Sequence, residues 1–69
     1  MKKEAKPYAK LRGKMAEQGV TQGMAAAVLG ITSQAFSRKI NGKFQFNMKE
    51  IRILKEYLEL ENVDDYFFN

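Results

Sequence analysis

The feature that most constrains the fold of this chain is a pair of helix signals on either side of one glycine, within residues 21–43. Thr21 suits the N-cap of a first helix, and residues 22–29 carry apolar side chains at helical spacing. Gly30 is the expected end of that helix, because the residue after a helix commonly takes a positive φ, which favours glycine. The glycine turn therefore holds two short helices at a fixed angle.

The second helix has its own start signal and is predicted over about residues 33–41. Thr32 stands at the N-cap position of this helix. Ile31 just before it and Phe36 four residues after it have the spacing of a hydrophobic staple. Phe36 and Ile40, four apart, face the first helix. The outward face carries side chains that can hydrogen-bond to base edges in a DNA major groove, namely Ser33, Gln34, Ser37, Arg38 and Asn41.

This segment resembles the helix-turn-helix of the phage repressor and Cro-like family, also called the XRE family. The usual family pattern is T-Q-x-x-x-A-x-x-L-G-[IV]-[ST], and the chain reads TQGMAAAVLGIT. The resemblance continues through SQAFSRKINGK and extends weakly over residues 7–68. It implies an all-α, lambda-repressor-like fold of five helices, with the helix-turn-helix at residues 21–41.

Two positions depart from the family pattern. The apolar residue that usually follows the arginine is Lys39 here, with the apolar role moved to Ile40, and the usual leucine of the first helix is Ala25. We expect the first change to rotate the second helix slightly. The second change thins the core between the helices and leaves room for Met24 or Met15.

The resemblance implies a sequence-specific transcriptional regulator, of phage or prophage repressor or Cro type, whose partner is a double-stranded DNA operator. In the family, the glutamine at the position of Gln22 contacts phosphate and steadies the second helix, and that role carries over. The candidates for base contacts are Ser33, Gln34, Ser37 and Arg38. The candidates for further phosphate contacts are Asn41 and Lys43. An alternative on the same fold is a protein-binding module, either an antitoxin or the partner of an antirepressor.

The charges are divided unevenly along the chain. Residues 1–43 contain nine Lys and Arg against two Glu, a net charge of +7, whereas residues 44–69 contain three against six acidic residues, a net charge of −3. Taken alone, such an asymmetry is as well explained by solvated surface. Because the basic half contains the motif, it also fits a surface that attracts phosphate.

Composition excludes several classes of protein. The chain has no Cys and no His, so it lacks disulfides and the usual zinc ligands, and also the side chains most often used as base or nucleophile. We therefore expect no enzyme, no cofactor, no metal and no small-molecule substrate. No apolar run approaches the roughly 20 residues that span a bilayer, and the first residues lack the apolar core of a signal peptide. The expected location is the cytoplasm, without membrane association.

The segments on either side of the motif also carry helix signals. Tyr8, Leu11 and Met15 form an apolar stripe that begins near Pro7 and stops at Gly19. This predicts a first helix at the start of a single domain over residues 7–69, with residues 1–6 as a flexible arm.

After the motif, two interpretations compete. Asn41 and Gly42, followed by the alternating Phe44 and Phe46, match a β-hairpin. We favour a helix end capped by Gly42, because the preceding residues are helical in spacing. Phe44 and Phe46 then become apolar plugs in a loop that returns to the core.

A further helix is predicted to begin at Asn47. Glu50 stands three residues later, as in a capping box, and an apolar stripe follows at Ile51, Leu54 and Leu58.

The chain ends in three consecutive aromatic residues, Tyr66, Phe67 and Phe68, in a last turn that Asn62 can cap. Helix neighbours lie about 100° apart, so one core cannot easily bury all three rings. We predict that these residues form the interface of a homodimer, at least on DNA. The simpler interpretation is a tail that folds back with two rings buried and one exposed.

Overall fold

The computed structural model describes residues 7–68, and within them it contains five α-helices and no strand. The helices are α1 (Ala9–Gln18), α2 (Gln22–Leu29), α3 (Ser33–Ile40), α4 (Met48–Leu58) and α5 (Val63–Phe67). The prediction of an all-α fold with five helices is confirmed, and the hairpin interpretation is excluded for the described residues. The predicted arm over residues 1–6 lies outside them, as does Asn69.

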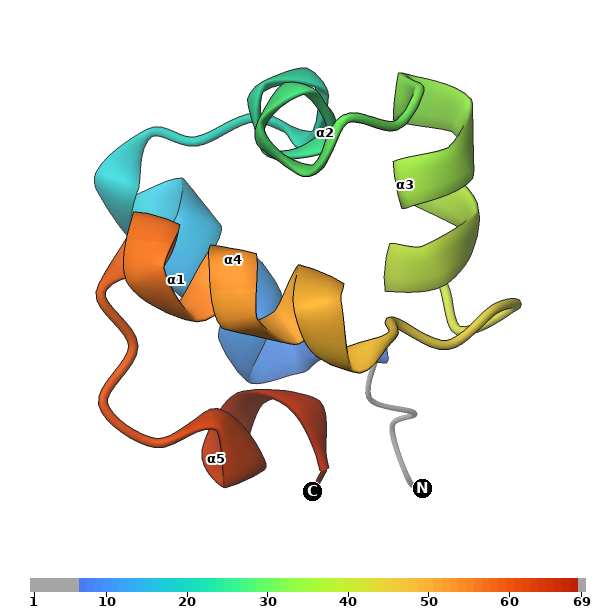
Figure 1. Cartoon of the computed structure of the whole chain (residues 1–69). Helices are drawn as coiled ribbons and strands as arrows, with labels where there is room; N and C mark the ends of the chain where they lie inside the picture. The colour runs from blue at the N-terminus through green and yellow to red at the C-terminus, as the bar shows by residue number, and fades with distance from the viewer. Residues whose placement is uncertain (1–6, 69) are drawn as a thin grey trace, which may run out of the picture.

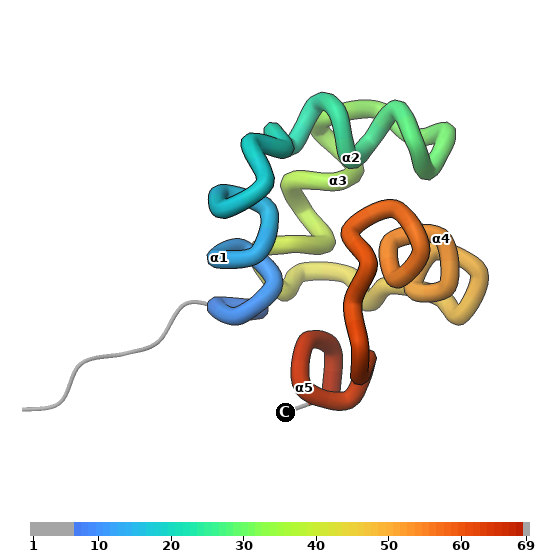
Figure 2. Tube along the Cα trace, turned by 90° about the vertical axis from the view of Figure 1, so that its left-hand side faces the viewer, coloured from blue at the N-terminus to red at the C-terminus, as the bar shows by residue number. Residues whose placement is uncertain are grey.

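The helices surround one core, with α4 in contact with α1, α2 and α5. Figure 1 shows α2 end-on above α1 and α4, with α3 standing along the edge of the molecule and α5 at the opposite end from α2. The second view places α1 and α4 on opposite sides of the core, with α5 beneath both (Figure 2). No helix of the described part is long and apolar enough to cross a membrane.

The core draws its largest fully buried side chains from α1, α3 and α4. They are Leu11, Phe36, Ile40, Leu54 and Leu58. Of the two methionines expected near Ala25, Met15 is buried in the core at 5% exposure, whereas Met24 is 44% exposed.

Four helices begin at the predicted capping residues. Thr21 and Thr32 each accept a hydrogen bond from a backbone N–H three residues later, at 3.1 Å. Asn47 and Glu50 form the complete capping box of α4. Asn62 caps α5 by accepting from the N–H of Asp64. These caps satisfy N–H groups that the helices themselves leave without partners.

The predicted stripe of α1 is confirmed at Leu11 and Met15, but α1 and the loop before α4 each differ from the prediction at one aromatic residue. Helix α1 begins at Ala9, and Tyr8 precedes it in a left-handed conformation with φ 55°. Its ring meets Phe46 edge-on at 5.3 Å, so the aromatic contact rather than the helical stripe sets its position. In the loop, Phe46 is buried at 7% exposure, but Phe44 is 59% exposed and is no plug.

Candidate functional site

Helix α3 has one buried face and one face open to solvent. Phe36 is fully buried and Ile40 is 1% exposed, so both anchor the helix to the core as the spacing predicted. The four candidate base-contacting residues stand at i, i+1, i+4 and i+5, which is one side of a helix. Ser33, Gln34 and Arg38 are exposed there and Ser37 is half-buried. The structure therefore brings these four side chains together as one polar strip on α3, the helix that stands at the edge of the molecule in Figure 1.

The turn between α2 and α3 is short and is held by local hydrogen bonds. Gly30 ends α2 with φ 75°, and the N–H of Ile31 donates to the carbonyl of Ala26 at 3.0 Å. Thr32 follows in an extended conformation as the cap of α3. With a glycine-type helix end and a side-chain cap only two residues apart, the direction of α3 relative to α2 is fixed by local geometry.

The candidate phosphate contacts lie at the two ends of this unit. Gln22 is exposed in the first turn of α2, and Asn41 and Lys43 are exposed just beyond α3. Gly42, with φ 85°, turns the chain, so that the N–H of Lys43 donates to the carbonyl of Arg38 at 2.9 Å. Lys43 is thereby held next to the last turn of α3. The helix itself ends at Ile40 and Asn41 caps it, one residue earlier than predicted.

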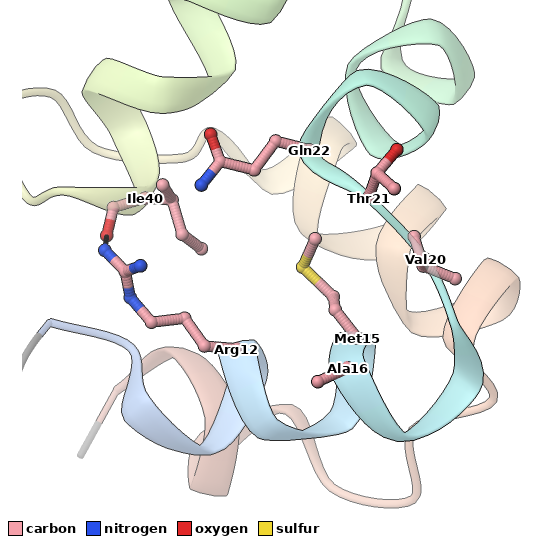
Figure 3. Close-up of a pocket in the computed structure, with 7 residues that line it drawn as sticks. All are labelled: Arg12, Met15, Ala16, Val20, Thr21, Gln22 and Ile40. Atoms are coloured by element: carbon pink, nitrogen blue, oxygen red, sulfur yellow. Dashed lines mark hydrogen bonds between the residues drawn. The ribbon is translucent and has the colours of Figure 1, made fainter.

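A hollow of about 280 Å³ separates the start of α2 from α1 and the end of α3. Met15 and Ile40 provide apolar walls, and Gln22 and Arg12 enter it from different helices (Figure 3). The side chain of Gln22 reaches from α2 toward the end of α3 in this view. The side chain of Gln22 therefore approaches the end of α3, which Asn41 and Lys43 follow directly in sequence.

Sequence reasoning missed the role of Arg12. Its guanidinium donates from Nη2 to the carbonyl of Ile40 at 3.1 Å and to Oδ1 of Asn41 at 2.7 Å, and from Nε to the carbonyl of Pro7 at 3.0 Å. Asn41 was predicted as a phosphate contact on the outward side of the second helix, and the structure shows that its amide oxygen accepts a hydrogen bond from Arg12 within the protein. Ile40 and Asn41 lie 28 and 29 residues from Arg12, and no local sequence pattern predicts contacts over that distance.

Lys39 was also left without an assigned role by the sequence. Its Nζ lies 2.8 Å and 2.9 Å from the two carboxylate oxygens of Glu50 on α4, and the two side chains are 18% and 8% exposed. Glu50 Oε1 also accepts from the N–H of Asn47 at 3.0 Å. This ion pair ties α3 to α4. The departure at Lys39 was the signal that could have prompted a search for its partner.

The acidic side chains of the described residues lie outside α2 and α3. Helices α2 and α3 contain no acidic residue, while the last turn of α3 carries Arg38 and Lys39. Helix α5 begins with Asp64 and Asp65, at the end of the molecule remote from α2 (Figure 1). The polar strip of α3 therefore lies on a surface free of acidic side chains from its own helix and from α2.

The aromatic tail divides into two partly buried rings and one exposed ring. The Phe67 ring lies 5.6 Å from that of Phe46, and Lys10 Nζ lies 5.9 Å from the centre of the Tyr66 ring. Phe68 is 60% exposed and follows the end of α5. Of the three residues predicted to form a dimer interface, Phe68 is the one that faces solvent.

These features describe a small all-α domain that presents one helix with a polar outer strip. Over residues 5–69 the chain matches a family described as a protein of unknown function, DUF739, and it belongs to that family. No curated protein matches the chain. The family description names no activity.

Proposed function

We propose that this protein is a sequence-specific, double-stranded DNA-binding transcriptional regulator of phage or prophage repressor or Cro type, acting in the cytoplasm. In this proposal α2 and α3 form a helix-turn-helix, and α3 enters the major groove. The observation that supports it best is the composition of α3, whose buried face is held by Phe36 and Ile40 while its open strip holds only Ser, Gln and Arg side chains.

The strip suits the reading of base pairs. Arg38 can donate two hydrogen bonds to the O6 and N7 acceptors of guanine, and Gln34 can pair with the donor and acceptor of adenine. The hydroxyl groups of Ser33 and Ser37 adapt to several bases. Each well-formed paired contact discriminates against a wrong base by about 1 to 3 kcal/mol.

The residues around the end of α3 suit the DNA backbone. Lys43 supplies a positive charge, and the amide groups of Gln22 and Asn41 supply N–H donors, which phosphate oxygens accept. Such contacts set the position of the protein on the duplex without reading its sequence. The net charge of +7 over residues 1–43 would make binding sensitive to salt.

The proposal predicts that residues of the polar strip and residues at the DNA backbone affect binding differently. Arg38→Ala or Gln34→Ala should each weaken binding to the preferred duplex by about 1 to 3 kcal/mol and weaken binding to random duplex much less. Lys43→Gln should weaken both alike and reduce the salt dependence by about one counterion. The preferred site comes from selection out of a random duplex pool, and affinities come from fluorescence anisotropy at several salt concentrations.

Arg52→Ala is the matched control, because Arg52 is also exposed on a helix but belongs to α4. Its affinity for the selected site should equal that of the wild type. A wild-type protein without any preference among duplexes at moderate salt would overturn the proposal and favour the protein-binding alternative.

We further propose that the protein binds its operator as a homodimer joined near the tail. Phe68 borders a hollow of about 100 Å³ that Gln45, Phe46 and Ile51 also line, and the exposed Phe44 and Met48 flank that segment in sequence. One short helix reads only a half-site, and two-fold proteins place two such helices about one turn of DNA apart. A second copy would cover these apolar side chains and supply the second helix.

Sedimentation of the free protein and of its operator complex tests the dimer. We expect two chains per duplex for the wild type, and a lower affinity with loss of the two-chain complex for Phe68→Ser. Val28→Ser, at an exposed apolar position on α2, should leave the stoichiometry unchanged. One chain per duplex at saturation, unaffected by Phe68→Ser, would rule out this interface.

A further inference from the structure

We propose that Arg12 is a positioning residue for DNA binding, which turns the amide group of Asn41 so that its N–H donors face the phosphate backbone. This inference rests on the DNA-binding function proposed above. It assigns to a side chain of α1 a role in the affinity of a surface that lies on α2 and α3.

The geometry at Arg12 fixes several groups at once. The planar guanidinium donates to three acceptors from two segments, the carbonyls of Pro7 and Ile40 and the side-chain oxygen of Asn41. The carbonyl of Ile40 is one of the last in α3, where a helix leaves carbonyl groups without internal partners and where a cation is favourable. Arg12 thus fastens α1 and the chain that enters it to the end of α3.

The turn beyond α3 is packed against the same segment. A Cβ built on Gly42 would lie 3.3 Å from Cγ of Pro7, so the chain entering α1 rests directly on this turn. Pro7 and Arg12 therefore both bring the start of α1 against the end of α3.

The hydrogen bond from Arg12 fixes the orientation of the Asn41 amide group. The Oδ1 end accepts from Arg12 at 2.7 Å, and the Nδ2 end is directed to Oγ of Ser37 at 3.4 Å. Phosphate oxygens only accept hydrogen bonds, so the Nδ2 end is the useful one for the DNA backbone. With Oδ1 held by Arg12, the side chain is already oriented before DNA arrives, and binding loses less rotational freedom.

Arg12 also keeps its charge available. Its three acceptors are uncharged, and within residues 7–68 the ion pairs involve Lys14 and Lys39 rather than Arg12. The positive charge beside Asn41 is therefore not offset by a carboxylate in the described part of the chain, which favours an anion at this position.

A double-mutant cycle on DNA affinity tests the inference. Arg12→Lys keeps the charge but cannot reproduce the planar set of hydrogen bonds, and Asn41→Ala removes the amide. We expect each single change to weaken binding to the selected duplex about five- to tenfold, and the double variant to bind no more weakly than the weaker single variant. A merely structural role for Arg12 would weaken binding by the same factor in both backgrounds. All affinities are measured well below the melting temperature of each variant.

Asn41→Asp separates the orientation of the side chain by Arg12 from the donation of a hydrogen bond to phosphate. The carboxylate still accepts from Arg12, so the melting temperature should be kept, but it offers no donor and repels phosphate, so affinity should fall at least as far as for Asn41→Ala. Arg52→Lys on α4 is the matched control and should bind as the wild type does.

The outcomes separate the two proposals. If the wild type prefers no duplex, the proposed function fails. If the wild type binds its site but Arg12→Lys binds equally well, or the effects of Arg12→Lys and Asn41→Ala multiply, the positioning role is overturned while the function stands.

Discussion

Phe36→Ala should lower the free energy of unfolding by about 3 to 5 kcal/mol, the usual effect of emptying a buried aromatic position. Phe36 is fully buried, and its ring lies 5.7 Å from that of Phe46. A chain of 69 residues buries only about 60% of its unfolded surface, so its total stability lies near the lower end of the usual 5 to 15 kcal/mol. The variant should therefore retain no more than about 2 kcal/mol and melt at a much lower temperature than the wild type, as thermal melting followed by circular dichroism would show.

Phe44→Ala provides the matched control. Phe44 is the same residue type, but it is 59% exposed in the loop before α4, so its loss should change stability by no more than about 0.5 kcal/mol. If Phe36→Ala kept the melting temperature of the wild type, the buried face of α3 would have been assigned to the wrong residues.

The parts of the fold that could be predicted are those that local hydrogen bonds determine. A cap such as Thr32 bonds to an N–H only three residues later, so the residue type and its spacing carry the information. The same holds for the capping box at Asn47 and for the glycine at the end of α2. Because the caps also fix where each helix begins, they correctly predicted which side of α3 is buried.

The contacts that could not be predicted join residues distant in sequence. Arg12 bonds to a residue 29 positions away and Lys39 to one 11 positions away, and neither spacing belongs to a local pattern. Likewise, Phe44 and Phe46 look equivalent in the sequence. Only Phe46 reaches the rings of Tyr8 and Phe67, which come from the two ends of the described chain.

The candidate site also combines features that the local sequence predicts with contacts that it does not. Its outward residues follow from the helical period of α3, whereas the two contacts that hold the end of α3 come from α1 and α4. The ion pair between Lys39 and Glu50 joins α3 to α4, so one carboxylate of another helix helps to hold α3 in place beside its buried apolar face.

Glu50→Ala should therefore destabilise the protein by about 3 kcal/mol or more, the second large effect that we expect. The substitution removes the acceptor for the N–H of Asn47 and leaves the ammonium of Lys39, only 18% exposed, without its partner. Removing one member of a largely buried ion pair is strongly destabilising, because the remaining charge stays poorly solvated. Chemical denaturation at constant protein concentration measures the loss.

Two further variants separate the loss of the acceptor for Asn47 from the loss of the ion pair with Lys39. Glu50→Gln still accepts from Asn47 and should lose less than Glu50→Ala. Combining it with Lys39→Met removes both charges and should recover part of the loss, since an uncharged pair of similar size needs no compensating ion. Glu56→Ala, at an exposed position of the same helix, should change stability by no more than about 0.5 kcal/mol. If Glu50→Ala unfolded at the same denaturant concentration as Glu56→Ala, the ion pair would contribute nothing to the anchoring of α3.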